Sequence, residues 1–284
     1  MTFFISEVSS NHAQDLERCL RFIDVSSEVG CDAVKFQLFK VDRLFSPEAI
    51  RSNPSLEDRK RWELPVHYLS ALKERCTARG LSFSCTPFYL EAVEELDPHV
   101  DFFKVASYEL MWDELLERCA RTGKPLVLST GMATLEEIEH AVAVCRDAKC
   151  KKLTLLHCVS GYPTPPGEAN LAAIESLRKR FDCDVGWSDH TVNPSVVGRA
   201  IHRWNVSTVE FHLDLDGDGA EYTSGHCWLP EQIAPVIRDA RLAVEIDGSD
   251  SKKIAPSEAS DRDWRADPSD GLRPLRKVRV HLGK

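Results

Sequence analysis

Short apolar segments alternate with longer segments of helical periodicity along most of this chain, and this alternation is the strongest constraint on its fold. The eight predicted strands are 3–10, 33–39, 81–86, 102–107, 125–130, 153–159, 184–188 and 208–213. The eight predicted helices are 16–30, 65–80, 89–96, 111–123, 134–148, 170–181, 194–204 and 229–246. Strands that are apolar throughout are typical of a parallel sheet covered on both faces. Eight such units predict an α/β fold of the closed (β/α)8 TIM-barrel type.

An open doubly wound sheet is the alternative fold. Such sheets usually contain fewer than eight strands, and no GxGxxG motif follows any predicted strand, which disfavours a dinucleotide-binding domain. We predict one barrel over residues 1–248 and an irregular C-terminal extension over residues 249–284, where helical periodicity is weak. The charged connection 40–64 is a candidate lid.

Charge and cysteine content narrow the class of protein. The chain has 45 acidic and 36 basic residues, and its net charge of −9 argues against nucleic acid or an anionic membrane as a partner. The ten cysteines are scattered through apolar periodic segments without a CxxC motif. The N-terminal segment lacks the features of a secretion signal, and no stretch approaches 18 apolar residues. We therefore expect a cytoplasmic protein with reduced cysteines and no membrane span.

Polar residues gather where the predicted strands end, which is where active sites lie in a (β/α)8 barrel. They are Glu7, Asn11, His12, Lys35, Gln37, Thr86, Lys104, Ser107, Glu109, Ser129, Thr130, His157, Ser160, Tyr162, Ser188, Asp189, His190, Glu210 and His212. A buried lysine is costly unless it meets an anion, so Lys35 and Lys104, with hydroxyl groups nearby, predict a phosphate pocket. The alternative is that these lysines form structural ion pairs, for instance with Glu7 or Glu109.

His190 and His212 end consecutive predicted strands and should be neighbours at the barrel mouth. Two imidazoles with a nearby carboxylate suit a divalent transition metal, although satisfied core histidines are also common. The run 214–219 (DLDGDG) resembles the start of an EF-hand loop, but its twelfth position is Gly225 rather than glutamate. We interpret this run as a turn rich in Asp and Gly.

A set of motifs in register resembles the N-acetylneuraminate (sialic acid) synthase family. The motifs, which span residues 3–213, are SEVSSNHAQDLE, CDAVKFQLFK, FSCTPF, DFFKVASYEL, KPLVLSTGMATLEEI, LLHCVSGYPTPP, VGWSDHT and EFH. The resemblance implies condensation of phosphoenolpyruvate with an N-acylhexosamine or a related sugar or aldehyde, giving a nonulosonic-type 2-keto acid and phosphate. It also implies a homodimer and a divalent metal ion, with Mn²⁺ expected and Mg²⁺, Co²⁺, Fe²⁺ or Zn²⁺ as alternatives.

The resemblance also implies roles for individual residues. Phosphoenolpyruvate would bind Lys35, Thr86, Lys104, Ser107, Ser129 and Ser188. Gln37, Glu109 and Tyr162 match positions that line the acceptor end of the family's pocket. His190 and His212 match the metal ligands, and with Glu7, which would handle protons or orient water, they form the predicted catalytic set.

The sequence departs from the family pattern at the acceptor end. Val159 replaces a hydroxyl residue before Ser160, and Phe211 replaces a basic residue on the eighth strand. The family's acceptor-binding aspartate has no equivalent, because Thr223 falls at its position when no gap is allowed. Glu221 or His226 could substitute only if the loop differs. We also expect the family's antifreeze-like C-terminal domain to be absent.

Two other functions stay open at this point. A Schiff-base aldolase would use Lys35 or Lys104 as an amine nucleophile. A barrel without catalytic activity would bind a sugar or phosphate ligand.

Overall fold

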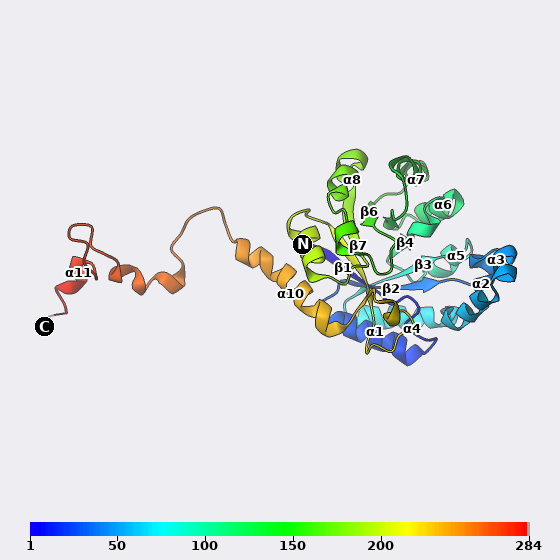
Figure 1. Cartoon of the computed structure of the whole chain (residues 1–284), viewed down its shortest axis with the longest axis horizontal. Helices are drawn as coiled ribbons and strands as arrows, with labels where there is room; N and C mark the ends of the chain where they lie inside the picture. The colour runs from blue at the N-terminus through cyan, green and yellow to red at the C-terminus, as the bar shows by residue number, and fades with distance from the viewer. Residues whose placement is uncertain (283–284) are drawn as a thin grey trace. The chain divides into compact units, whose positions relative to one another are not determined.

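The computed structural model describes residues 1–282, in which eight parallel strands close into a barrel (Figure 1). The strands are β1 (Phe3–Glu7), β2 (Ala33–Leu38), β3 (Ser82–Pro87), β4 (Phe102–Val105), β5 (Leu126–Ser129), β6 (Leu153–Cys158), β7 (Asp184–Asp189) and β8 (Thr208–Leu213). Each strand pairs with the next, and β8 pairs with β1, which places Glu7 opposite His212. The predicted (β/α)8 barrel is therefore confirmed.

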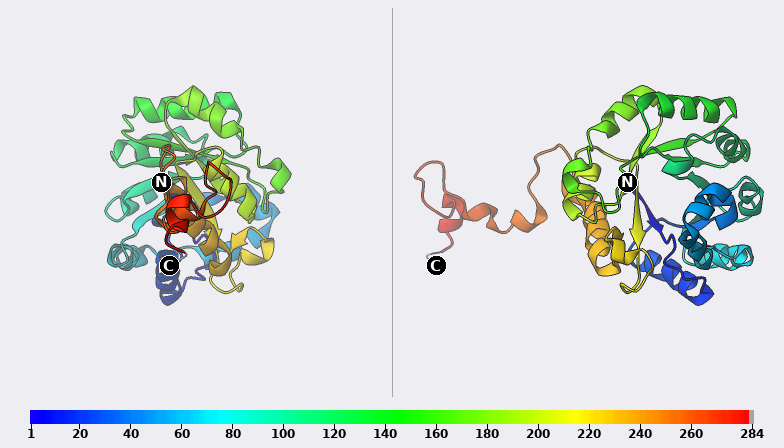
Figure 2. Two further views of the ribbon diagram at one scale, coloured as in Figure 1. Left: turned by 90° about the vertical axis from the view of Figure 1, so that its left-hand side faces the viewer. Right: turned by 45° about the vertical axis from the view of Figure 1, so that its right-hand side comes forward.

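Helices between the strands form the ring around the barrel that Figure 2 shows. The α-helices are α1 (Leu16–Glu28), α2 (Val41–Leu44), α3 (Pro47–Ser52), α4 (Leu69–Ala78), α5 (Ala92–Leu96), α6 (Asp113–Arg121), α7 (Leu135–Asp147), α8 (Ala173–Phe181), α9 (Pro194–His202), α10 (Pro230–Asp247) and α11 (Arg276–Arg279). The 3₁₀ segments are η1 (Pro54–Trp62), η2 (Val66–Tyr68), η3 (Ser107–Glu109), η4 (Pro166–Glu168), η5 (Tyr222–Ser224), η6 (Pro256–Glu258) and η7 (Asp261–Trp264). The connection 40–64 thus contains α2, α3 and η1.

Local signals explain several helix boundaries. Asp15 caps α1 by accepting a hydrogen bond from the backbone N–H of Glu17 at 2.9 Å. A capping box is present at α7, where the side chains of Thr134 and Glu137 each accept from the other residue's backbone N–H. Gly30 follows α1 with a φ of +92°, a backbone conformation that favours glycine.

The barrel interior has an apolar layer and a polar layer. Toward the amino-terminal ends of the strands it is filled by a buried cluster of Ile5, Ala33, Phe102, Val127 and Leu156. Successive side chains of a strand point to opposite faces, so the residue two positions further along faces the interior again. Two positions beyond that cluster stand Glu7, Lys35, Lys104, Ser129 and Cys158. Because alternate residues of each strand face the interior, these charged and hydroxyl side chains line the interior at the carboxyl ends of the strands.

Residues Met1–Ala243 form one compact unit, and the chain from Val244 onward forms a second. The first unit ends inside α10, before the boundary predicted at residue 248. The second unit contains η6, η7 and α11, and Asp270 is ion-paired there with Arg276 at 3.2 Å and with Arg279 at 2.8 Å.

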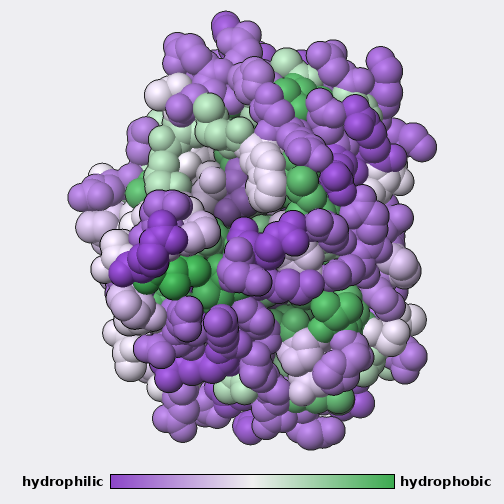
Figure 3. Space-filling model, turned by 90° about the vertical axis from the view of Figure 1, so that its right-hand side faces the viewer, coloured by the Kyte–Doolittle hydropathy of each residue, from purple (hydrophilic) through white to green (hydrophobic). Residues whose placement is uncertain are grey.

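The side of the molecule in Figure 3 is mostly hydrophilic, with separate small hydrophobic areas. None of the described helices is both long and apolar enough to cross a membrane. All ten cysteines are free thiols, and eight of them are buried.

Candidate active site

A buried cluster of two lysines and two glutamates lies at the carboxyl ends of β1, β2, β4 and β8. The Lys104 Nζ is 3.3 Å from Glu210 Oε1, and the Lys35 Nζ is 3.8 Å from the same oxygen. Lys35 also forms an ion pair with Glu7 and donates a hydrogen bond to Thr86 Oγ1 at 3.1 Å. Each lysine is only 2% exposed. Glu210 therefore joins both lysines, which fixes their ammonium groups side by side.

The electrostatics of this cluster follow from burial and close charges. Burial lowers the pKa of Lys35 to about 7, with Glu210 opposing the shift and Lys104 adding to it. Burial also raises the pKa of Glu109 to about 7, against the effect of Lys104. Although burial alone would raise the pKa of Glu210, Lys104 and Lys35 hold it below its usual value. A buried anion placed near the lysines would stabilise their charged forms.

Hydroxyl groups surround the lysines at the neighbouring strand ends. Thr86, Ser129 and Ser188 are buried on β3, β5 and β7. The buried Ser129 Oγ and Ser160 Oγ have no hydrogen-bond partner within residues 1–282. Unpaired buried donors are costly, so these two hydroxyls are suited to a ligand with acceptor oxygens.

Gly131 lets the chain after β5 approach these hydroxyls closely. Its N–H donates a hydrogen bond to Ser107 Oγ at 3.0 Å. A Cβ at position 131 would overlap Ser160 Oγ and would lie 2.9 Å from Ser107 Oγ. The structure thus brings Ser107, on η3, together with Ser160 after β6.

The residues predicted for the acceptor end are more accessible. Gln37 on β2 and Glu109 on η3 are half-buried, and the Tyr162 side chain is exposed. The Tyr162 ring lies 4.3 Å from the His190 ring and 6.1 Å from the His212 ring, between ring centroids. Tyr162 therefore covers part of the histidine cluster on its accessible side.

Three histidines meet beside the lysine cluster. The ring centroids of His190 and His212 are 5.3 Å apart, as expected for residues that end consecutive strands. His226 joins them, with its ring 4.7 Å from that of His212 and 6.3 Å from that of His190. His190 Nδ1 donates to the Val159 carbonyl at 2.8 Å, so in the neutral ring Nε2 carries the lone pair. His226 has a buried side chain and comes from the loop after β8.

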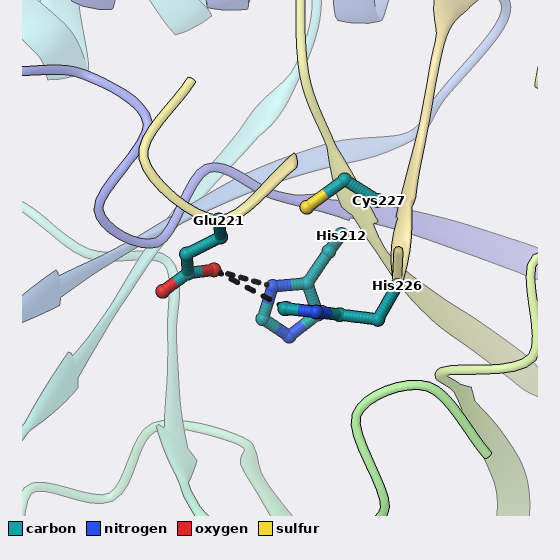
Figure 4. A group of neighbouring side chains, drawn as sticks. All are labelled: His212, Glu221, His226 and Cys227. Carbon is teal, nitrogen blue, oxygen red and sulfur yellow. Dashed lines mark hydrogen bonds and ion pairs between the residues drawn. The ribbon is translucent and has the colours of Figure 1, made fainter. Parts of the chain in front are cut away.

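Glu221 is the carboxylate of this histidine cluster (Figure 4). Its Oε2 lies 3.1 Å from His212 Nδ1 and 3.5 Å from His226 Nε2. Its Oε1 accepts a hydrogen bond from Ser9 Oγ at 2.6 Å, and its backbone N–H donates to Asn11 Oδ1 at 2.9 Å. Burial lowers the pKa of His212 to about 4 despite Glu221, so its ring is neutral and able to act as a ligand at pH 7.

The run 214–219 holds this loop in place and behaves as a turn. Asp214 Oδ2 accepts hydrogen bonds from the N–H groups of Gly217 at 2.8 Å and Gly219 at 3.1 Å. Arg18 binds Asp214 at 3.0 Å and Asp216 at 2.8 Å. The carboxylates of Asp214 and Asp216 are thus used to fix the backbone.

Glu210, Glu221 and His226 have positions in the site that were not predicted from the sequence. Glu210 is one of several polar residues on strand ends, and nothing in its spacing shows that it joins two lysines. Glu221 and His226 reach the histidine cluster, although the ungapped position of the family's aspartate is Thr223. The signal for Glu221 and His226 is their residue type in the loop after a strand that ends in histidine.

The fold and the site define a (β/α)8 barrel with a cationic pocket and a histidine–carboxylate cluster at the carboxyl ends of its strands, where enzymes of this fold carry their active sites. The chain belongs to the NeuB family, whose model matches residues 22–252. This membership confirms the resemblance found in the sequence.

Individual relatives agree with that assignment. The chain is 32% identical to the N,N'-diacetyllegionaminic acid synthase of Campylobacter jejuni, over 90% of this chain and 80% of that enzyme. It is 35% identical to an uncharacterized protein of Methanocaldococcus jannaschii, over 90% of this chain and 75% of that protein. The crystal structure of N-acetylneuraminic acid (sialic acid) synthetase from Leptospira borgpetersenii, in complex with citrate, matches with a TM-score of 0.78 and 28% identity, over 92% of this chain and 90% of that chain.

Proposed function

We propose that this protein is a condensing synthase that joins phosphoenolpyruvate to an N-acylhexosamine or a related sugar or aldehyde. The product is a nonulosonic-type 2-keto acid, and phosphate is released. Membership of the NeuB family and the similarity to a legionaminic acid synthase support this activity. The observation that carries the proposal is the pair of buried lysines on one glutamate, together with two serine hydroxyls that have no hydrogen-bond partner among the described residues.

Phosphoenolpyruvate is a small polyanion, and the lysine cluster provides the groups that bind one. Lys35 and Lys104 supply charge that the glutamates neutralise in the absence of a ligand. The hydroxyl groups of Thr86, Ser107, Ser129 and Ser188 supply directional donors for phosphate and carboxylate oxygens. Ser160 adds a hydroxyl donor to which the family resemblance assigned no role in phosphoenolpyruvate binding.

The acceptor binds at the more accessible end, against Gln37, Glu109 and Tyr162. C3 of phosphoenolpyruvate attacks the acceptor's carbonyl carbon and forms the new C–C bond, and the carbonyl oxygen takes up a proton. Water adds to C2, and phosphate leaves as the C2–O bond breaks, which yields the 2-keto group. Glu7, which is buried beside Lys35, is the residue we assign to orienting this water and accepting its proton.

The histidine cluster fits a divalent metal ion. His212, Glu221 and His226 each offer a ligand atom within 4.8 Å of the others, and His190 adds an imidazole. Imidazole and carboxylate ligands suit Mn²⁺, Co²⁺, Fe²⁺ and Zn²⁺ and are less typical of Mg²⁺. When bound, such an ion would act as a Lewis acid on the acceptor's carbonyl oxygen. His190 and His212 would hold it at the boundary between the two substrate ends.

A substrate screen tests this proposal. Purified protein with Mn²⁺ is mixed with phosphoenolpyruvate and a panel of aldoses and N-acylhexosamines, and loss of the enol absorbance and release of phosphate are followed. We expect consumption only when both substrates are present. No consumption with any acceptor, together with phosphoenolpyruvate binding, would favour the barrel without catalytic activity. Borohydride trapping of a substrate on Lys35, whose lowered pKa leaves more of its amine unprotonated at pH 7, would indicate a Schiff-base aldolase instead.

We also expect a homodimer in the cytoplasm. Light scattering on the eluate of a size-exclusion column measures the number of chains in the particle, and a monomer at micromolar concentration would contradict the expectation.

A further inference from the structure

The loop between β8 and α10 places His226 next to His212. β9 (Cys227–Trp228) pairs in parallel with β8 beyond the point where the pairing of β7 ends, with Cys227 beside His212. The buried Trp228 anchors this short strand, because its Nε1 donates to Asp189 Oδ2 at 2.9 Å. This pairing fixes His226, the residue before β9, next to His212.

The His226 ring is 4% exposed, yet neither of its nitrogens forms a hydrogen bond with any residue that the structure describes. Its nearest charged neighbour is Glu221 Oε2, which lies 3.5 Å from Nε2, beyond a good hydrogen-bond distance. Buried polar groups in proteins are nearly always hydrogen-bonded or bound to an ion. A buried ring whose nitrogens make no hydrogen bond within residues 1–282, beside the His212 imidazole and the Glu221 carboxylate (Figure 4), is suited to bind a metal ion.

Glu221 is placed to orient the imidazoles rather than to pair with a lysine. The hydrogen bond between Glu221 Oε2 and His212 Nδ1 is the carboxylate–histidine contact that fixes the tautomer of a metal ligand and leaves Nε2 free. Ser9 and Asn11, 212 and 210 residues away along the chain, hold Glu221 in this position. The loop after β8 therefore places both His226 and the carboxylate of Glu221 in the histidine cluster.

We infer that His226 is a third protein ligand of the metal ion, so that His190, His212 and His226 form a three-histidine site with Glu221 as the positioning carboxylate. Cys227 is not part of this set, because its Sγ already accepts from Asn11 Nδ2 at 3.6 Å. Three imidazoles hold borderline ions such as Zn²⁺ and Co²⁺ more tightly than two. This inference rests on the metal dependence proposed above.

Metal binding by the purified full chain tests the inference without using activity. The protein is stripped with a chelator, Zn²⁺ affinity is measured by competition with a chromophoric chelator, and the Co²⁺ form is examined by visible absorption. We expect one ion for each wild-type chain. His226→Ala should weaken Zn²⁺ binding at least about 100-fold and change the Co²⁺ spectrum, and Glu221→Gln should weaken Zn²⁺ binding about 10- to 100-fold, the range for loss of an orienting partner.

Two matched controls separate ligand loss from general damage. His140→Ala removes an exposed histidine paired with Asp113 on the outer ring, and Cys227→Ser changes the neighbouring thiol. Both should keep the wild-type affinity and spectrum. If His226→Ala fails to fold, His226→Cys in the Cys227→Ser background replaces it, and the inference then requires a thiolate-to-cobalt charge-transfer band, whose absence overturns it.

Wild-type affinity and spectrum in His226→Ala would overturn the inference and leave the proposed function intact. A wild-type chain that takes up neither ion would overturn both the inference and the metal dependence. In either case, calorimetry of phosphoenolpyruvate binding to the same metal-free sample tests the lysine cluster independently of the metal site.

Discussion

Lys104→Met should separate the two tasks of the lysine cluster, which are to balance a buried glutamate and to bind an anion. Lys104 Nζ lies 3.3 Å from Glu210 Oε1, and both side chains are almost fully buried. Methionine keeps most of the volume of the lysine side chain and removes its charge. Glu210 then keeps only Lys35, whose ammonium is 3.8 Å from the same oxygen.

The loss of stability can be estimated from this geometry. Removing one partner of a buried ion pair costs about 3–5 kcal/mol, and we expect about 3 kcal/mol because Lys35 remains. An unfolding entropy of about 2.1 cal/mol/K per residue gives about 0.6 kcal/mol/K for 284 residues, so Tm should fall by about 5 °C. Loss of one charge-assisted contact of about 1.5–3 kcal/mol should raise the phosphoenolpyruvate Kd about 10- to 150-fold.

A double variant distinguishes these effects. In Lys104→Met/Glu210→Gln both members of the pair are neutral, and Lys35 keeps Glu7 as its partner. Replacing a whole buried ion pair is often neutral for stability, so most of the lost Tm should return. The weak binding should persist, because the ammonium is still missing. Tm is measured by differential scanning fluorimetry and Kd by calorimetry, with the exposed Lys179→Met, which should change neither, as the control.

Two results would refute this reasoning. If Lys104→Met binds phosphoenolpyruvate with wild-type affinity, the anion binds elsewhere and Lys104 serves only Glu210. If the double variant is as unstable as the single one, the unpaired charge of Glu210 is not the cause of the instability.

Three further predictions concern the other parts of the site. Because burial raises the pKa of Glu109 from 4.5 to about 7, the folded protein holds a proton that the unfolded chain releases, so stability should fall as pH rises through this range. Glu109→Gln should flatten that decline in urea titrations at a series of pH values, and an unchanged slope would contradict the assignment. Gly131→Ala should displace Ser160 and Ser107 and raise the phosphoenolpyruvate Kd at least about tenfold in calorimetry, whereas Gly198→Ala, with open space around it, should bind normally. His190→Ala, His212→Ala or exhaustive chelation should abolish turnover, and a divalent transition ion should restore it to the chelated wild type; full activity in a metal-free sample would disprove metal dependence.

The barrel could be predicted from the sequence because each of its units is a local pattern. An apolar run followed by an amphipathic helix can be identified within about 30 residues, and eight repeats leave few topologies. Two strand ends were predicted two or three residues too late. Segments 3–10 and 102–107 leave the sheet after Glu7 and Val105, because the chain turns there into the loops that carry site residues.

The part of the site inside the barrel, which contains the two lysines, is also predictable from local patterns. Once a strand is located, its period of two fixes which residues face inward, so Lys35 and Lys104 could be assigned to one pocket before any contact was known. Their exact partners could not be assigned in this way. That Glu210 joins both lysines depends on the stagger of β8 against β2 and β4 around the barrel, which no single strand encodes.

The loop half of the site follows different rules. Glu221 reaches the histidines because Ser9 and Asn11 hold it, and these contacts join residues more than 200 positions apart. Thr223 falls at the position of the family's aspartate when no gap is allowed, so an ungapped alignment does not identify Glu221 as the loop's carboxylate in the site. Such a loop can change its residues while the barrel and its lysine cluster stay the same, since its anchors lie at the rim. We therefore expect differences in acceptor choice among related chains to follow the loop after β8, and differences in phosphoenolpyruvate binding to be small.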